Sequence, residues 1–163
     1  MEYVYVGKIV NTHGIKGELR IRSDFDRKEQ IFKKGFILYV GEGHIPEEIV
    51  TYRKHKVFDM VTFKGYDNIN QVLNYLKMNV YVNRDDLGLS NDEYLLDDLR
   101  NLDVYENGEL LGKVEDIVYN GSNILLYVSG DENFYIPYND HYIGKVNLLE
   151  KRIEVTDAKG LIL

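Results

Sequence analysis

Histidines, serines and adjacent aspartates are the residues of this chain that could catalyse a reaction or hold a metal. The histidines show neither the H-x-x-H nor the H-E-x-x-H spacing of a zinc site, and they are His13, His44, His55 and His141. No serine lies in the G-x-S-x-G turn of a nucleophile, and the serines are Ser23, Ser90, Ser122 and Ser129. The pairs Asp85-Asp86 and Asp97-Asp98 could bind a metal, but adjacent acids in loops are usually solvated. We therefore expect no enzyme, no cofactor and no metal site.

A basic, glycine-containing turn near the start of the chain offers phosphate binding instead. Two β-type runs, residues 3–10 and 18–22, flank His13-Gly14-Ile15-Lys16-Gly17, whose glycines let the backbone take positive φ and reverse. Glu18 is the one acid among the basic residues Lys8, Lys16, Arg20 and Arg22. Lysine and arginine side chains at such a tip can meet phosphates in salt-sensitive contacts.

Other interpretations of this turn are weaker or plainer. His13 could act as a general base, but a histidine at a hairpin tip more often makes a hydrogen bond or touches RNA. Gly14 and Gly17 do not make a nucleotide-binding loop, because such a loop opens a helix and a strand follows here. An ordinary hairpin with glycines for the turn and lysines for solubility is the plain alternative.

A second candidate surface combines apolar and acidic residues, and its members are Tyr94, Leu95, Leu96, Asp97 and Asp98. This mixture suits a basic protein partner, because complementary charge speeds encounter while apolar burial holds the complex. The alternative for the two leucines is packing in the core of a domain.

Charge is unevenly divided along the 163 residues, although 44% hydrophobic and 29% charged residues are ordinary for a globular protein. Residues 1–83 hold 13 Lys and Arg against 10 Asp and Glu, while residues 84–163 hold 7 against 17. Such a chain could approach RNA with its first half and a basic protein with its second, unless the asymmetry is accidental. The chain has no cysteine, no apolar run of membrane-spanning length and no signal peptide, so we expect a cytoplasmic protein.

The first half predicts a small closed β-barrel over residues 1–83. Its expected strands are residues 3–10, 18–22, 36–40, 48–56, 57–63 and 79–82, with a loop and one helical turn over 23–35. One amphipathic helix is expected over residues 69–76, because Ile69, Val72, Leu73 and Leu76 follow the i, i+3, i+4, i+7 pattern. The polar residues 84–92 are the expected linker.

The second half, residues 93–163, predicts another small barrel of about five strands. The expected strands are residues 102–105, 110–119, 124–128, 134–138 and 152–155. Two Asn-Gly pairs, at residues 107–108 and 120–121, are strong hairpin signals on either side of the longest run. The fold class is therefore mainly β, with two small β-barrels in tandem.

The order of residues 7–19 resembles the opening of the RimM family, bacterial factors for maturation of the small ribosomal subunit. That family typically begins with G-[KR]-I-x-x-x-H-G-[IV]-[KR]-G-E-[VL], and this chain fits the run without a gap. In the second half, residues 92–99 resemble the start of the PRC-type barrel of that family. Three further segments follow in the order of the family, and they are Gly108-x-x-x-Gly112-x-Val114, Asn120-Gly121-Ser122-Asn123 and Phe134-Tyr135-Ile136-Pro137-Tyr138. The tail, residues 146–163, also matches.

Two departures from the family pattern fall at the start of the second half. The family commonly has two or three consecutive aromatic residues there, whereas only Tyr94 is aromatic here and Leu95 and Leu96 follow. Asn101 replaces a usual glycine. Leucines keep the apolar character of this surface but lose the stacking and hydroxyl contacts of aromatic rings.

The resemblance implies a translation-factor-like N-terminal barrel with one helix and a ribosome maturation factor without enzymatic activity. It implies a monomer that binds the immature 30S subunit through the head ribosomal protein S-nineteen and assists folding and processing of the 16S rRNA head. The residues implied at the ribosomal protein are Tyr94, Leu95, Leu96, Asp97, Asp98, Gly121 and Asn123. Those implied near rRNA are His13, Lys16, Arg20 and Arg22. No membrane and no small-molecule substrate are implied.

Two other functions remain open from the sequence. A translation-factor-like module acting on RNA directly would bind naked RNA with a steep salt dependence. A PRC-barrel protein of electron transfer or stress adaptation is less supported, because the chain shows neither a membrane span nor a cofactor-ligand pattern.

Overall fold

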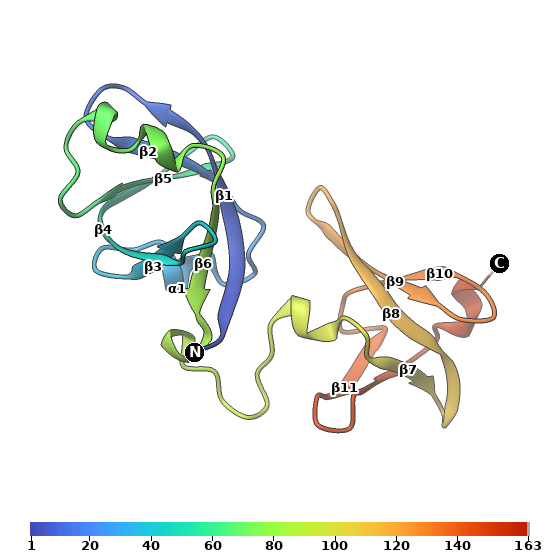
Figure 1. Cartoon of the computed structure of the whole chain (residues 1–163). Coiled ribbons are helices and arrows are strands. Elements are labelled where there is room, and N and C mark those ends of the chain that lie inside the picture. Colours follow the sequence, from blue (N-terminus) through green and yellow to red (C-terminus); the bar gives the residue numbers. More distant parts are fainter. Residues whose placement is uncertain (163) are drawn as a thin grey trace. The chain divides into compact units, whose positions relative to one another are not determined.

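The computed structural model describes residues 1–162 and separates the chain into two units, residues 1–92 and 93–163 (Figure 1). Each unit is built around its own six-stranded β-sheet. The mainly β class predicted from the sequence is confirmed.

The first unit is a closed barrel with strand order β1-β2-β5-β4-β3-β6. Its strands are β1 (Tyr3–His13), β2 (Glu18–Arg22), β3 (Ile37–Val40), β4 (Ile45–His55), β5 (Phe58–Phe63) and β6 (Asn79–Asn83). In β2, Leu19 and Ile21 are fully buried while Arg20 and Arg22 alternate with them toward the outside. Apolar residues therefore fill the barrel and the basic residues of this strand face solvent.

The short elements of the first unit lie between or after its strands. The predicted helical turn is α1 (Lys28–Ile31), and Lys28 forms an ion pair of 2.8 Å with the buried carboxylate of Asp59 on β5. The first residues of the expected linker form the 3₁₀ turn η3 (Arg84–Leu87), in which Leu87 is buried. The backbone N–H of Arg84 donates to the carbonyl of Glu2, which ties η3 to the start of the chain.

The predicted helix over residues 69–76 is wrong. The structure has two 3₁₀ turns, η1 (Ile69–Gln71) and η2 (Leu73–Tyr75), separated by Val72 at φ −116° and ψ 1°. Ile69, Val72 and Tyr75 point inward at i, i+3, i+6, the period of a 3₁₀ helix, whereas Leu73 is 45% exposed. The Tyr75 hydroxyl also donates to the Glu47 carboxylate at 2.5 Å, which fixes the second turn on β4.

The second unit is a six-stranded sheet in the order β10-β9-β8-β7-β12-β11. Its strands are β7 (Asp103–Glu106), β8 (Glu109–Asn120), β9 (Asn123–Ser129), β10 (Phe134–Pro137), β11 (Ile143–Asn147) and β12 (Arg152–Val155). All neighbours run antiparallel except β12 and β7, which are parallel. The edge strand β11 was not expected from the sequence, and its mostly half-exposed residues explain the weak signal.

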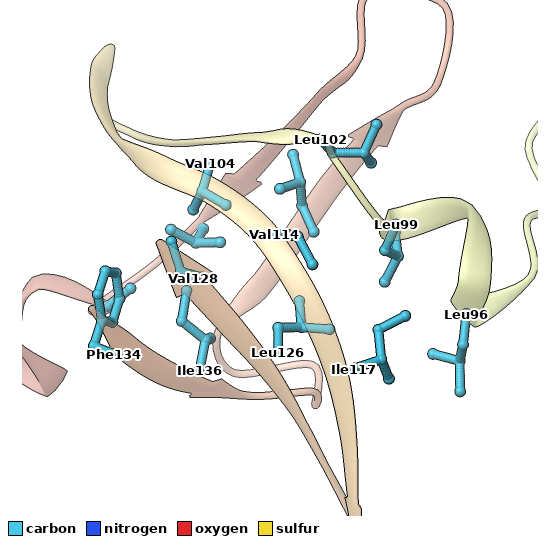
Figure 2. Packing of buried hydrophobic residues seen from close by; sticks show 13 residues of the cluster. Leu96, Leu99, Leu102, Val104, Val114, Ile117, Leu126, Val128, Phe134 and Ile136 are labelled. Carbon is cyan, nitrogen blue, oxygen red and sulfur yellow. The ribbon is translucent and has the colours of Figure 1, made fainter. Parts of the chain in front are cut away.

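The core of the second unit joins this sheet to the 3₁₀ turn η4 (Leu96–Leu99) (Figure 2). Leu96 and Leu99 project from η4 toward β8, where Leu96 lies beside Ile117. Leu126 lies in the middle of the cluster, and Val128, Phe134 and Ile136 complete its opposite side. The segment that precedes the sheet is therefore part of the core.

A buried carboxylate fixes the last 3₁₀ turn, η5 (Lys159–Leu161), onto the second unit. The Glu106 Oε1 atom accepts hydrogen bonds from the backbone N–H groups of Ala158 at 2.6 Å and Lys159 at 3.3 Å. Glu106 is 8% exposed and Ala158 is fully buried. This one side chain thus satisfies two donors at the start of η5.

Candidate functional site

A basic surface of the barrel comes from two neighbouring hairpins, β1–β2 and β4–β5. We call it the basic hairpin surface, and its residues are His13, Lys16, Arg20, Arg22, Arg53, His55 and Lys56. All four residues predicted in the first half, His13, Lys16, Arg20 and Arg22, belong to it. The other three come from the run R-K-H-K at residues 53–56, whose charge is visible in the sequence although it was not predicted as a site; Lys54 of this run alternates to the opposite face.

Contacts between side chains give this surface a defined geometry. The Arg20 guanidinium lies 3.0 Å from Nδ1 of His13, so it donates a hydrogen bond to that nitrogen. The guanidinium carbons of Arg20 and Arg22 lie 5.6 and 5.8 Å from the ring centre of Phe58 on β5. Both arginines therefore lie within cation–π distance of one aromatic ring.

Glu18 and Arg53 connect the two hairpins. Arg53 donates to both carboxylate oxygens of Glu18, at 2.9 and 2.8 Å. These hydrogen bonds, together with the charges of Arg53, His13 and His55, lower the pKa of Glu18 although partial burial acts against them. Glu18 thus connects the two hairpins, and the guanidinium group whose charge it neutralises is that of Arg53.

Two histidines lie together among these cations. The rings of His13 and His55 are 5.7 Å apart in an edge-to-face arrangement. Desolvation lowers the pKa of His55, and the charges of Arg53, Lys56, His13 and Arg20 lower it further. A neutral His55 at pH 7 follows, because its pKa lies below the ordinary value of about 6.5.

The tip of the β1–β2 hairpin is exposed but fixed at its base. Ile15 is 75% exposed, while its carbonyl accepts a hydrogen bond of 2.8 Å from the N–H of Ile69. Gly17 has φ +90°, and a Cβ there would lie 3.4 Å from the backbone nitrogen of Asn68. Beside the tip is an open pocket of about 450 Å³, which is lined by His13, Gly14, Ile15, Lys16, Glu18 and Thr62. The tip therefore combines a basic side chain with a backbone fixed at its base and a pocket beside it.

The residues predicted to contact a ribosomal protein do not form one surface. Leu95 and Leu96 are 1% and 4% exposed, so their expected role as exposed apolar contacts is corrected and both are core residues. The cap of η4 explains this burial. The backbone N–H of Leu95 donates to the Asp98 carboxylate at 2.8 Å, which caps the start of η4 and directs the leucines of this turn toward the sheet. Asp97 remains exposed, with Arg100 within 2.5 Å of its carboxylate.

Arg100 reduces the acidity expected of this segment. It pairs with Asp116 on β8 at 2.6 Å as well as with Asp97, and the hydrogen bonds to both carboxylates raise its pKa. The same contact with Arg100, aided by the N–H of Ile117, lowers the pKa of Asp116. Two aspartates and one arginine thus form a network on the surface beside η4.

The predicted residues Tyr94, Gly121 and Asn123 are connected through the sheet. The hydroxyls of Tyr94 and Tyr138 are 2.6 Å apart, and the N–H of Tyr138 donates to the carbonyl of Ile124 at 2.8 Å. Asn123 precedes Ile124 and pairs with Asn120, and Gly121 forms the turn between them at φ +63°. Tyr94 therefore lies one tyrosine away from the start of β9, and Gly121 lies at the exposed end of that hairpin.

Groups of three or more His, Asp or Glu side chains placed for a metal ion are absent from residues 1–162. Over the same residues, no helix is long and apolar enough to cross a membrane.

Comparison with known proteins assigns the chain to a family. Two family models match it, the RimM N-terminal domain over residues 4–87 and the RimM PRC barrel domain over residues 96–161. The chain belongs to the RimM family. The resemblance seen in both halves of the sequence is therefore confirmed, and so is a PRC barrel domain as the second unit.

Relatives in the RimM family match the chain from end to end. A protein of Streptococcus mutans named ribosome maturation factor RimM is 40% identical over 168 residues, which cover 99% of this chain and 98% of that protein. A protein of the same name from Exiguobacterium is 36% identical, with 99% and 98% covered. The crystal structure of a Pseudomonas aeruginosa 16S ribosomal RNA processing protein RimM is 22% identical, with a TM-score of 0.48 and 97% and 99% covered.

Proposed function

We propose that this chain is a ribosome maturation factor that acts in the cytoplasm as a monomer without enzymatic activity. It binds the immature 30S subunit through the head ribosomal protein S-nineteen and assists folding and processing of the 16S rRNA head. The relatives named ribosome maturation factor RimM support this role. The observation that carries it is the basic hairpin surface, in which Phe58 and His13 hold guanidinium groups in place for phosphates.

Binding at this surface combines charge with shape. The first half carries 13 basic and 10 acidic residues, so its net charge is too small for strong unspecific RNA affinity. Two hairpins that place five or more cations on one surface compensate locally, because phosphate binding depends on nearby charges. The braced arginines and the formed tip favour an RNA of matching shape over random single strands.

The second unit is the proposed site for the ribosomal protein. Residues 84–163 carry 17 acidic against 7 basic residues, which suits a basic partner. With Leu95 and Leu96 in the core, the contact surface comes from Tyr94, Asp97 and the β8–β9 turn with Gly121 and Asn123. Asp98 acts indirectly, since it fixes η4 through the N–H of Leu95.

Such a factor works by shifting populations. It binds one arrangement of the immature head more tightly than the others, and the difference in binding free energy raises the share of that arrangement. Dissociation then follows when the mature head no longer offers the same surface.

Sedimentation of the tagged protein from a lysate tests the proposal. Comigration with free small subunits that carry unprocessed 16S rRNA is the expected result. A protein that stays at the top of the gradient even at low salt would contradict binding to the subunit. Steeply salt-dependent binding to naked RNA, with none to isolated S-nineteen, would favour direct action on RNA instead.

A paired substitution tests how the two units divide the task. Lys16→Glu with Arg20→Glu should weaken association with immature subunits more than association with isolated S-nineteen, because both residues lie on the basic hairpin surface of the first unit. Equal losses in the two assays would refute this division.

A further inference from the structure

Five aromatic rings lie together on the outside of the barrel, on β1, β3 and β6 and in the turn between β3 and β4. Tyr39 of β3 pairs with Tyr81 of β6, which pairs with Tyr5 of β1, so three tyrosines stand opposite one another across three strands. Their neighbours in sequence, such as Val80 and Val82, are fully buried, so the tyrosine rings occupy the outer side. We call this set, with Tyr3 and His44, the tyrosine face.

The rings contact one another closely. Tyr3 stacks on His44 with ring centres 3.8 Å apart, and it meets Tyr39 edge to face at 5.2 Å. His44 also meets Tyr81 edge to face at 4.8 Å, and Tyr5 lies 6.0 Å from Tyr81. These contacts hold the rings in one arrangement before any partner arrives.

Much of this aromatic surface remains in contact with solvent. Tyr5 is 55% exposed and Tyr3 is 36% exposed. Tyrosine is enriched at protein interfaces because it combines a large apolar ring with a polar end and few rotatable bonds.

Carboxylates act on two tyrosines of this face. Partial burial, Tyr81 and the carboxylate of Asp24 raise the pKa of Tyr5, and burial and Asp86 do the same for Tyr39. Two carboxylates therefore act on the hydroxyl ends of this face. Arg84 is the nearby cation, and it lies 3.5 Å from the carboxylate of Glu2. Lys8 lies farther along β1, opposite Asn79 and Arg22.

We propose that the tyrosine face docks a basic, arginine-containing segment of a partner protein. Guanidinium groups stack on tyrosine rings and pair with carboxylates, and this face offers the stacked rings together with Asp24 acting on Tyr5 and Asp86 acting on Tyr39. Phosphates would meet repulsion at the same place, which sets this face apart from the basic hairpin surface. The inference adds a contact of the first unit with protein to the proposed contact with rRNA.

An NMR titration of the full chain with an arginine-rich peptide of about ten residues tests the proposal. We expect amide shifts at β1, β3 and β6, and weaker binding of a peptide in which lysine replaces every arginine, because lysine stacks less well on rings. Tyr5→Ser should weaken binding of the arginine peptide at this face about two- to fivefold, while Tyr5→Phe, which keeps the ring, should restore most of it. The double substitution Asp24→Asn with Asp86→Asn should reduce the salt dependence of binding of the arginine peptide.

A matched control exists in the second unit. Tyr135 is 50% exposed on β10 and follows the acids Asp131 and Glu132 in the sequence, and its ring contacts that of Tyr127, with the ring centres 4.9 Å apart. Tyr135→Ser should leave binding at the tyrosine face unchanged. The same spectra distinguish binding at the tyrosine face from unspecific binding to the acidic second unit, because each amide signal reports on its own residue.

Three outcomes would overturn the proposal. Amide shifts confined to the second unit, together with no effect of Tyr5→Ser, would show that the arginine peptide does not bind the tyrosine face. Shifts of β1, β3 and β6 that are larger with oligouridylate RNA would make it a stacking platform for bases. Concentration-dependent self-association that Tyr5→Ser abolishes would make the occupant a second copy of this chain.

Discussion

The substitution Leu96→Ala distinguishes a core residue from a partner contact. Leu96 is 4% exposed and packs with Leu99 and Ile117 in the cluster that joins η4 to the sheet. Removing a buried leucine to its Cβ costs about 2.7–5 kcal/mol, because the lost transfer free energy adds to the cost of the cavity. A unit of about 70 residues has a total stability of only about 4–10 kcal/mol, so Leu96→Ala should remove a large part of it.

Urea unfolding of the full chain, followed through NMR signals of the second unit, measures this loss. The midpoint for the second unit should fall strongly, and its melting temperature should drop by at least about 10 °C, since 1 kcal/mol shifts a unit of this size by about 4–8 °C. Signals of the first unit provide an internal reference. Leu149→Ala is the matched control, because Leu149 is 97% exposed and should change stability by less than about 0.5 kcal/mol.

The partner assay completes this test. At a temperature where Leu96→Ala is still folded, binding of S-nineteen should stay close to that of the unchanged chain. If Leu96→Ala kept its stability but no longer bound S-nineteen, the burial argument would be refuted and Leu96 would be a contact residue of the interface. Loss of both properties in Leu149→Ala would show that exposed leucines of this unit matter more than its core.

Two further predictions concern pH and the end of the second unit. Acidification should strengthen RNA binding as His55 gains charge, at a pH below the ordinary value of about 6.5 because its pKa is lowered, and His55→Gln should reduce that gain in filter binding at constant ionic strength. The folded state lowers the His55 pKa, so the unfolded chain binds more protons as the pH falls, and urea unfolding should show stability lost over the same range. Glu106→Ala should cost about 1–3 kcal/mol in urea unfolding, because the buried N–H of Ala158 loses its acceptor. Glu106→Gln should cost less than half of that, since an amide oxygen still accepts; equal costs would contradict this role.

Local turn chemistry made the hairpins predictable. Gly14 and Gly17 both have positive φ in the β1–β2 turn, as their positions required. Asn107 and Gly108, at φ 50° and 82°, form the expected turn between β7 and β8. The second Asn-Gly signal gave the right hairpin, although the turn itself lies on Gly121 and Ser122 because Asn120 still pairs with Asn123.

Features that depend on distant residues were not predictable in this way. A spacing of three at Ile69, Val72 and Tyr75 fits a 3₁₀ turn as well as a helix, and the hydroxyl contact between Tyr75 and Glu47 favours the former. The edge strand β11 has no strong alternation of its own and exists because β12 offers it a partner.

The candidate site shows the same limit. The basic residues of the β1–β2 hairpin were identified from their charge, but the β4–β5 hairpin joins them through the pairing of β2 with β5 and the contact of Glu18 with Arg53, which are distant in the sequence. Leu95 and Leu96 were wrongly expected at the surface, because a short run beside two acids has the same sequence pattern whether it faces a partner or a core.

The parallel pairing of β7 with β12 has a consequence for the order of folding during synthesis. The barrel of the first unit has all its strands once Asn83 is made, whereas the sheet of the second unit waits for Arg152–Val155. At about 5–20 residues per second, the intervening stretch of about 70 residues takes about 4–14 s. The barrel is the one complete sheet throughout that interval, and from the synthesis of Ser129 onward β7, β8 and β9 form an incomplete sheet with an open edge until β12 is made.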